Sequence, residues 1–287
     1  MRSNNEYSRT AEGVALLRTL EQIYPAGRRI LDDPYAAAFL QDPRLNFIAR
    51  SSLLSHLMVG FLNRWSPGAQ EMLALRARLA DDVAVEMASE LEQIVILGAG
   101  FDTMALRIKD ALRTVTVFEV DHPATQAVKR NAFVRLGIPA SVQFVAIDLE
   151  RDDFVLKLRP AGFASERRSL VVWLGVMCYL TMQAITRAMN QITELGGTGT
   201  RLVFDYIQAD VIDGSSHNRE ALNKARRMAR LGEPWLFGLS PEQVPDFLAS
   251  FGLKLIKDYG PAELRAHYCP RRRMPIDYDR IVVCERL

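Results

Sequence analysis

Residues 93–130, QIVILGAGFDTMALRIKDALRTVTVFEVDHPATQAVKR, decide the fold of this 287-residue chain. The apolar run that opens the stretch predicts a buried strand, and Gly98 and Gly100 allow a tight turn after it. A short helix, a second strand and a second helix are expected to follow. The acids Glu119 and Asp121 close the second strand. This order predicts an α/β fold that binds a nucleotide-type cofactor, with an acid placed for its ribose.

The glycine turn does not match the dinucleotide fingerprint of dehydrogenases. That fingerprint, G-x-G-x-x-G, needs a third glycine for close packing of helix on strand, and this chain has Thr103 there. Asp102 would also lie beside a pyrophosphate at a helix N-terminus, where two negative charges repel each other. A cofactor without phosphate fits better. S-adenosylmethionine is such a ligand, because it combines a ribose diol, an adenine and a zwitterionic tail that carries a sulfonium.

Strands and helices continue to alternate after this stretch, as in a mostly parallel sheet with helices on both faces. The fold class is therefore interpreted as α/β and Rossmann-like, with a last strand that runs antiparallel. Seven strands are predicted, at 93–97, 115–120, 142–146, 169–174, 200–206, 252–259 and 280–286.

The residues before the sheet are expected to form a helical cap. Apolar periodicity predicts helices over 10–23 and 69–91, and a further helix is expected to open at Asp33-Pro34, because proline suits a first helical turn. Residues 208–240 are longer than an ordinary connection, which predicts a helix plus loop that acts as a lid.

Composition favours a protein that acts on a small molecule. A hydrophobic content of 49% is enough for a large core, and we expect one domain over 1–287, with a cap over 1–92 and a core over 93–287. The net charge of +2, from 36 basic and 34 acidic residues, gives no strong attraction for nucleic acid or an anionic membrane. A small-molecule partner is therefore expected.

Cysteine spacing and the N-terminus favour a soluble cytoplasmic protein without a bound metal. Cys178, Cys269 and Cys284 are far apart and form no C-x-x-C pair, which indicates reduced thiols rather than a disulfide or zinc framework. The N-terminal residues lack the apolar core of a signal peptide, and no apolar stretch reaches the ~20 residues of a membrane span.

Ligands of open α/β sheets bind beyond the carboxyl ends of the strands, so the residues there form the candidate site. Gly98-Ala99-Gly100 offers bare backbone to the cofactor after the first strand. Asp121 and Glu119 lie two apart and face the same side, and Asp121 is the better ribose ligand because it lies nearer the strand end. Glu119 either shares this task or pairs with a nearby arginine, and His122 lies beside Asp121.

Two further candidates come from the third strand and from the cap. Asp148 can accept a hydrogen bond from an adenine amino group while Leu149 donates its backbone N–H; Asp148 could instead cap a helix near Asp152. Arg76 and Arg78 lie in the helical word LALRARLADD, from which a guanidinium can bind a carboxylate, although most helix arginines are solvated.

These words together resemble a known family. The chain is similar to the leucine carboxyl methyltransferase family of S-adenosylmethionine-dependent enzymes. The motifs that carry this similarity are RTAEGVALLRTLE, LDDPYAAAF, LRARLADD, VILGAGFDTMALRI, VFEVDHPATQAVKR and GEPWLFG. The glycine word together with EVDHP is the most specific part. Bacterial members include enzymes that esterify carboxylates on polyketide intermediates in natural product biosynthesis. Eukaryotic relatives methylate the C-terminal leucine of a protein phosphatase or a carboxylate on a modified transfer RNA base.

The resemblance implies a class I methyltransferase fold with S-adenosylmethionine as the cofactor. It also implies a contact to each part of that cofactor. The implied contacts are Arg76 for the methionine carboxylate, Gly98 for the tail, Asp121 for the ribose, and Asp148 with Leu149 for the adenine.

The chain departs from the family at Leu174, where many members carry an acid before a glycine at the end of the fourth strand. Leucine cannot bind the cofactor's amine electrostatically, so another group, such as a backbone carbonyl near Gly98 or Gly175, has to take this task. The departure also keeps open a protein that binds the cofactor without turnover.

The acceptor decides whether a catalytic base is needed. A carboxylate is already an ionised nucleophile, so methyl transfer to it requires positioning and water exclusion but no general base. O-methylation of a small-molecule carboxylate is the preferred interpretation. A phenolic or alcoholic hydroxyl is the alternative, and it would need a base, with His217 in the lid or His122 as candidates. His122 precedes Pro123, so it also suits a structural role at a helix start.

Four aromatic residues are candidates for the substrate pocket, because each lies near a strand end or in the lid. Core packing is the alternative for all four. The run Arg271-Arg272-Arg273 could meet a substrate carboxylate but is expected to be a solvated loop. The four aromatic candidates are Tyr179, Tyr206, Trp235 and Phe237.

Overall fold

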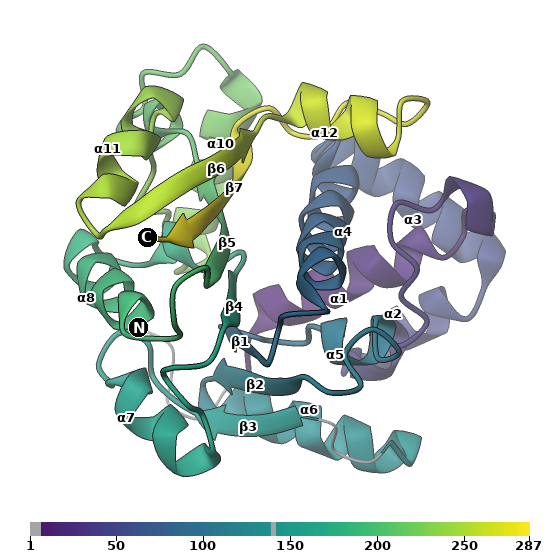
Figure 1. The fold of residues 1–287 in the computed structure, drawn as a ribbon. Helices are drawn as coiled ribbons and strands as arrows, with labels where there is room; N and C mark the ends of the chain where they lie inside the picture. The colour runs from purple at the N-terminus through teal and green to yellow at the C-terminus, as the bar shows by residue number, and fades with distance from the viewer. Residues whose placement is uncertain (1–6, 139–141) are drawn as a thin grey trace.

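The described residues, 7–138 and 142–287 of a computed structural model, form a seven-stranded sheet with the order β3-β2-β1-β4-β5-β7-β6 (Figure 1). Only β7 runs antiparallel to its neighbours. The predicted fold class is confirmed, and every predicted strand lies within one residue of its expected bounds. The strands are β1 (Gln93–Leu97), β2 (Thr116–Asp121), β3 (Val142–Ala146), β4 (Ser169–Trp173), β5 (Arg201–Ile207), β6 (Leu253–Tyr259) and β7 (Asp279–Arg286).

Strand β1 lies at the point where the strand order reverses. It pairs in parallel with β2 on one side and with β4 on the other, so Gln93 is in register with both Thr116 and Ser169. In doubly wound sheets a ligand binds beyond the carboxyl ends of the strands at this switch point. The turn after β1 and the segment after β4 therefore border the place where a ligand is expected.

Alternate residues of the central strands enter two separate cores. Ile94 and Ile96 of β1 pack on the cap side, whereas Val95 and Leu97 pack in the opposite core. Figure 1 shows α1, α4 and α5 on the cap side of the sheet and α7, α8 and α11 on the other. This alternation decides which strand side chains can reach the cap, because residues two apart share a face.

From residue 7 to the start of the sheet, the chain forms four α-helices and two short 3₁₀ helices, as expected for a cap. They are α1 (Arg9–Glu21), η1 (Ala26–Arg28), η2 (Ala36–Phe39), α2 (Pro43–Ala49), α3 (Ser52–Trp65) and α4 (Ala69–Met87). The later helices are α5 (Met104–Arg107), α6 (Pro123–Leu136), α7 (Phe154–Leu158), η3 (Arg159–Ala161), η4 (Met177–Tyr179), α8 (Met182–Thr193), α9 (Ala209–Asp213), α10 (Arg219–Arg230), η5 (Pro241–Gln243), α11 (Val244–Ala249) and α12 (Pro261–Tyr268). Among the described residues no single helix has the length and apolarity to cross a membrane.

The helix expected at Asp33-Pro34 is wrong. The carboxylate of Asp33 accepts the backbone N–H groups of Tyr35, at 3.2 Å, and Ala36, at 3.1 Å, so the chain turns there and only the short η2 follows. The expectation of a solvated arginine run also fails at Arg272. Its guanidinium donates to both carboxylate oxygens of Glu21, at 2.8 and 3.1 Å, and so ties the C-terminal part of the chain to α1.

The segment 208–240 folds into a helix plus loop, as predicted, with α9 and α10 in its first part. Its second part is attached at both sides of the molecule. The Thr10 hydroxyl of α1 donates to the carboxylate of Glu233, and the backbone N–H of Leu236 donates to the carbonyl of Cys178, at 2.6 Å. The lid thus joins the cap to the segment that follows β4.

Candidate active site

The glycine turn brings the ends of β1 and β2 together. Gly98 has φ +65°, and a Cβ at this position would lie 2.4 Å from Cγ2 of Val176. Gly100 has φ +50°, and its backbone N–H donates to Oδ2 of Asp121. The N–H of Ala99 donates to the carbonyl of Val120, at 3.0 Å. Residues 98 and 100 therefore have to be glycine, since both adopt a left-handed backbone and one of them touches the segment after β4.

A buried ion network supports this turn from the cap side. Nη2 of Arg18 donates to the carbonyl of Phe101, at 2.5 Å, and Arg18 Nη1 lies 3.5 Å from the carboxylate of Asp102. Burial favours the neutral form of Asp102, but Arg107 and Arg18 outweigh it and hold its pKa below the usual value. The negative charge of Asp102 is thus balanced by two arginines, which weakens the electrostatic argument that the sequence suggested against a bound phosphate.

Asp121 lies at the end of β2, as expected, with its carboxylate held by two backbone groups. Oδ2 accepts the N–H of Gly100, and Oδ1 accepts the N–H of His122, at 2.5 Å. His122 is the N-cap of α6, and its Nδ1 accepts the N–H of Ala124, at 3.3 Å. A carboxylate fixed in this way is oriented before any ligand arrives, which suits a ribose diol.

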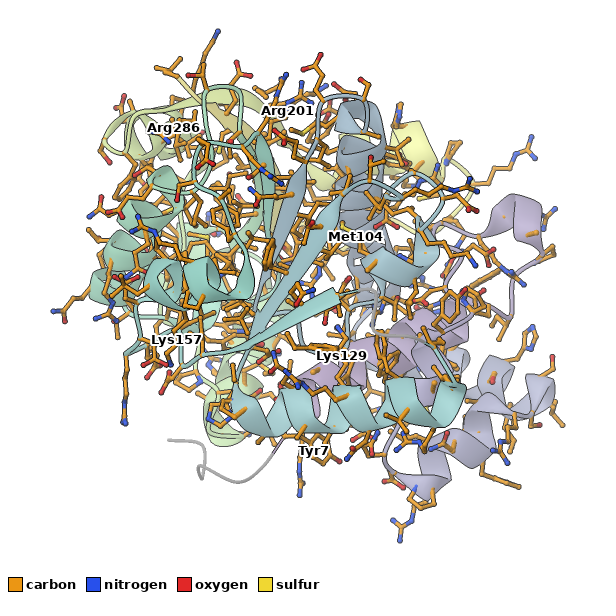
Figure 2. All side chains as sticks on the ribbon, turned by 60° about the horizontal axis from the view of Figure 1, so that its bottom comes forward. Tyr7, Met104, Lys129, Lys157, Arg201 and Arg286 are labelled. Atoms are coloured by element: carbon orange, nitrogen blue, oxygen red, sulfur yellow. The ribbon has the colours of Figure 1, made fainter. Side chains whose placement is uncertain are left out.

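Glu119 shares the face of Asp121, as predicted, but its partner is a lysine and not an arginine. Oε2 of Glu119 lies 2.5 Å from Nζ of Lys129, and both side chains are buried. Figure 2 places Lys129 on α6. Burial raises the pKa of Glu119 to about 7, and Lys129 acts in the opposite direction. Glu119 is therefore part of the protein interior, behind the strand end.

The adenine candidates follow β3 directly. The N–H of Ile147 donates to the carbonyl of Asp121, at 2.9 Å, which brings Asp148 beside the end of β2. Oδ1 of Asp148 accepts the N–H of Glu150, at 3.0 Å. The alternative role of Asp148 as a helix cap is wrong, because Asp153 caps α7. Leu149 packs against the core opposite the cap, and the adenine role of both residues stays a prediction.

Arg76 of α4 reaches the ends of β4 and β5. Its Nη1 donates to Oδ2 of Asp205, at 2.8 Å, and a Cβ at Gly175 would lie 2.6 Å from its Nη2. Burial alone would lower the pKa of Arg76, but Asp205 and Asp279 together with smaller contributions outweigh it, and the pKa is raised. Arg78 is the solvated arginine of the pair, since its side chain is 44% exposed against 13% for Arg76.

A second buried acid, Asp279 of β7, lies on the same face as Asp205. Asp205 is in register with Ile281 of β7, and Ile281 packs in the cap-side core, so Asp279, two residues earlier, faces that side as well. Asp279 is 7% exposed, and its Oδ1 accepts no hydrogen bond from any described residue. Burial and Asp205 raise the pKa of Asp279 well above its usual value, with Arg76 acting in the opposite direction.

Two of the four predicted pocket aromatics lie near this cluster. Burial raises the pKa of the Tyr179 phenol in η4, and the positive charge of Arg76 acts in the opposite direction. Trp235 of the lid has its ring centre 5.9 Å from that of Tyr278. The structure places the other two in the core on the opposite face of the sheet. Tyr206 donates its hydroxyl to Asp258, at 2.9 Å, and Phe237 is buried there too, so their expected role in the pocket is wrong.

His217 lines a polar cavity of about 250 Å³ at the start of the lid. The imidazole itself is exposed. Gln208, which follows β5 directly, contributes one wall, so the cavity lies just past a strand end. Its lining residues are Gln208, Asp210, Ser216, His217, Asn218, Asp277 and Tyr278. Within the described ranges no group of three His, Cys, Asp or Glu side chains could hold a metal ion.

The sequence reasoning missed Asp205 and Asp279. A signal existed for Asp205, because it is the only charged residue in the interior of the strand word RLVFDYI, and a charge there is expected to have a partner. Asp279 gave no comparable signal, since DYDR begins a strand after a polar loop.

A family model described as leucine carboxyl methyltransferase matches residues 11–193. The chain belongs to the leucine carboxyl methyltransferase family. The resemblance seen in the sequence is thereby confirmed, together with the enzyme class. S-adenosyl-L-methionine is the cofactor named for the relatives of this family member.

Three relatives illustrate the similarity, each named as a candidate S-adenosyl-L-methionine-dependent methyltransferase. A Bacillus subtilis protein is 28% identical, with an alignment that covers 63% of this chain and 60% of that protein. A Mycolicibacterium smegmatis protein is 32% identical, over 71% and 68%. A Frankia alni protein is 30% identical, over 81% and 83%. The match to the Bacillus protein thus spans less than two thirds of that relative's length.

Solved structures share the fold of this family member at low identity. A candidate methyltransferase from Thermobifida fusca superimposes with a TM-score of 0.60 and 17% identity, over 93% of this chain and 97% of that one. A DUF574 family protein from Streptomyces avermitilis gives 0.63 and 14%, over 94% and 97%. These similarities support the class I methyltransferase fold.

Proposed function

We propose that this protein transfers a methyl group from S-adenosylmethionine to a carboxylate of a small molecule and forms a methyl ester. The observation that carries the choice of acceptor is the state of the histidines that the sequence offered as bases. The imidazole of His122 caps α6 through Nδ1, and His217 is exposed in the lid. A carboxylate acceptor needs neither of them, because it is ionised at neutral pH.

The residues at the strand ends fit the cofactor. The left-handed turn at Gly98 and Gly100 brings the chain back to the end of β2, where Asp121 presents an oriented carboxylate for a diol. Arg76 brings a buried guanidinium that suits a carboxylate. When bound, the cofactor supplies an electrophilic methyl group on a sulfonium, and this group is the one that the acceptor carboxylate receives.

The protein's own contribution is positioning and exclusion of water. The lid is attached to α1 through Thr10 and Glu233 and to η4 through Leu236 and Cys178, so it joins the cap to the segment after β4. An ionised carboxylate becomes a better nucleophile when water is removed from it. Alignment of the acceptor with the methyl group accounts for the rest of the acceleration, without a proton transfer.

The test is calorimetric titration with S-adenosylmethionine and S-adenosylhomocysteine, followed by an assay with labelled methyl donor on a panel of carboxylates and phenols. We expect micromolar binding of both ligands and label that alkaline hydrolysis releases as methanol, because esters are cleaved by base and aryl ethers are not. Failure of both ligands to bind, or label that resists base, would contradict the proposal.

Methylation of a hydroxyl is the second candidate, and the cavity beside His217 favours it. If the acceptor is a phenol or alcohol in that cavity, the imidazole is the general base, and His217→Ala should lower kcat by about 100-fold or more. With a carboxylate acceptor the same variant should keep its rate. The expected partner in both cases is a small molecule, and the cytoplasmic location stays a prediction that suits three free cysteines.

A further inference from the structure

The end of β4 provides no charge for the amino group of the cofactor. Leu174 is partly buried and packs against the cap-side core. The nearest charges come instead from neighbouring strands. Asp205 of β5 accepts the N–H of Gly175 with Oδ1, at 2.6 Å, and Asp279 of β7 lies on the same face. Two carboxyl groups thus lie near Leu174, the position at which many family members carry an acid.

Among the described residues the cluster holds two acids and one cation. Arg76 is 2.8 Å from Asp205 and pairs with that carboxylate, whereas Asp279 forms no ion pair with another described side chain. The titratable groups that face Asp279 or Asp205 are one guanidinium, two phenols, a thiol and the two acids themselves. They are Arg76 from α4, Cys178 and Tyr179 from η4, Asp205 from β5, and Tyr278 and Asp279 at the start of β7.

Asp279 is also incomplete as a hydrogen-bonding group. Its side chain is 7% exposed, and its buried Oδ1 has no donor among the described residues. A buried oxygen without a partner costs free energy unless a ligand satisfies it. An ammonium group meets both needs, because it carries one positive charge and three N–H donors.

The cluster adjoins the turn that is expected to hold the cofactor's tail. Gly175 has no side chain and lies against the Arg76 guanidinium, while the next residue, Val176, lies against Gly98 of the glycine turn. A continuous line of contacts therefore runs from the turn after β1 to the pair of acids. A zwitterion that places its carboxylate on Arg76 has its amine within the same neighbourhood.

We propose that Asp205 and Asp279 hold the ammonium group of the cofactor's methionine portion, in place of the acid that position 174 lacks. The proposal rests on the proposed function, since it requires the cofactor to be S-adenosylmethionine. Burial and the neighbouring Asp205 raise the pKa of Asp279 well above its usual value, and the arriving ammonium favours the ionised form. Binding should therefore lower the pKa of Asp279 and release a proton at pH values between its free and bound pKa.

The wild-type protein tests the proposal without any substitution. Calorimetry measures the affinity for S-adenosylhomocysteine and for its analogue that has hydrogen in place of the amino group. The ratio of the two affinities gives the preference for the amine. We expect the amine to improve affinity by about tenfold or more, with proton release that shows as a dependence of the binding heat on the buffer's ionisation enthalpy. Equal affinities for the two ligands would overturn the proposal.

Variants separate this role from a structural one. Asp279→Asn should reduce the preference for the amine towards unity and abolish proton release, and adding Leu174→Glu should restore the preference. Asp277→Asn, an exposed acid two residues away that accepts from Asn218, is the matched control and should bind as the wild type does. A preference that survives in Asp279→Asn would contradict the assignment.

The two proposals fail in different ways. If wild type binds neither S-adenosylmethionine nor S-adenosylhomocysteine, the proposed function is wrong. If it binds both but ignores the amino group, only the assignment of the acids is wrong. If the amino group matters but Asp279→Asn does not change its effect, a backbone carbonyl near Gly98 or Gly175 performs the task instead.

Discussion

The ends of β1 and β2 and the ends of β4, β5 and β7 lie along the same edge of the sheet but are assembled differently. In the first region, Gly100 and Asp121 are 21 residues apart, and the backbone N–H of Gly100 donates to the Asp121 carboxylate. In the second, Arg76 and Asp205 are 129 residues apart and come from the cap and the core. The residues of the first region lie in one contiguous stretch of sequence, whereas those of the second come together only when the chain folds.

The difference explains which kind of interaction stabilises each region. The first is stabilised by backbone geometry, because a left-handed glycine and short main-chain bonds leave few alternatives. The second depends on buried side-chain charges, whose free energy changes strongly when one partner is removed. Substitution of a glycine in the first region should therefore act through shape, whereas loss of a charged side chain in the second should leave its buried partner uncompensated.

The largest effect is expected for Gly98→Ala. Its Cβ would collide with Val176 at a residue with φ +65°, so we expect a loss of cofactor affinity of more than ~100-fold and a destabilisation of about 2 kcal/mol. Gly137→Ala is the control, because Gly137 has φ +61° but nothing within 4 Å of a Cβ. The difference between the two variants in calorimetry and thermal melting isolates the effect of the Cβ contact with Val176. Equal effects in the two variants would show that the collision is unimportant.

A somewhat smaller effect is expected for Asp121→Asn. The amide oxygen can still accept the N–H of Gly100 or His122, but the charge that strengthens a hydrogen bond to the ribose diol is gone. We expect an affinity for S-adenosylhomocysteine lower by about 10- to 100-fold, with an unchanged melting temperature of the free protein. Unchanged affinity would remove the ribose assignment.

In the second region, Arg76→Lys should lower the affinity by about tenfold. Lysine keeps the charge that pairs with Asp205 but cannot offer a planar fork to a carboxylate. The neighbouring Arg78→Lys serves as the control, since Arg78 is solvated and pairs with Asp82. If both variants bind the cofactor equally well, Arg76 is a structural residue that only orients Asp205.

The smallest effect on cofactor binding is expected at Glu119, where the change concerns the pH dependence of stability. Its pKa is raised in the folded protein, from 4.5 to about 7, so its contribution to stability is complete below pH 4.5 and is lost as the pH rises to about 7. The loss amounts to at most ~3 kcal/mol. The free energy of unfolding, measured with urea between pH 4.5 and 7, should therefore change less with pH in the double variant Glu119→Gln, Lys129→Met than in the wild type. An unchanged slope would assign the pH dependence to other groups.

The two regions also show how far sequence reasoning reaches. Strand positions, the glycine turn and Asp121 followed from apolar runs and turn residues, which act over a few positions. The pairing of Glu119 with Lys129 did not follow, because it depends on how α6 packs against β2. The buried role of Arg272 did not follow either, because its partner Glu21 is 251 residues away. Asp279 is the clearest case, since its neighbours Asp205 and Arg76 come from two other parts of the chain.

Strand β7 is the last strand along the chain, yet it lies between β5 and β6. During synthesis, β6 is therefore made before the strand that pairs with it, and β5 has an open edge for the same period. Unpaired edges are the sites where nascent chains associate wrongly. Because Asp279 begins β7, the acid pair is completed only when this strand enters the sheet between β5 and β6, so the proposed amine site also reports that the sheet is fully assembled.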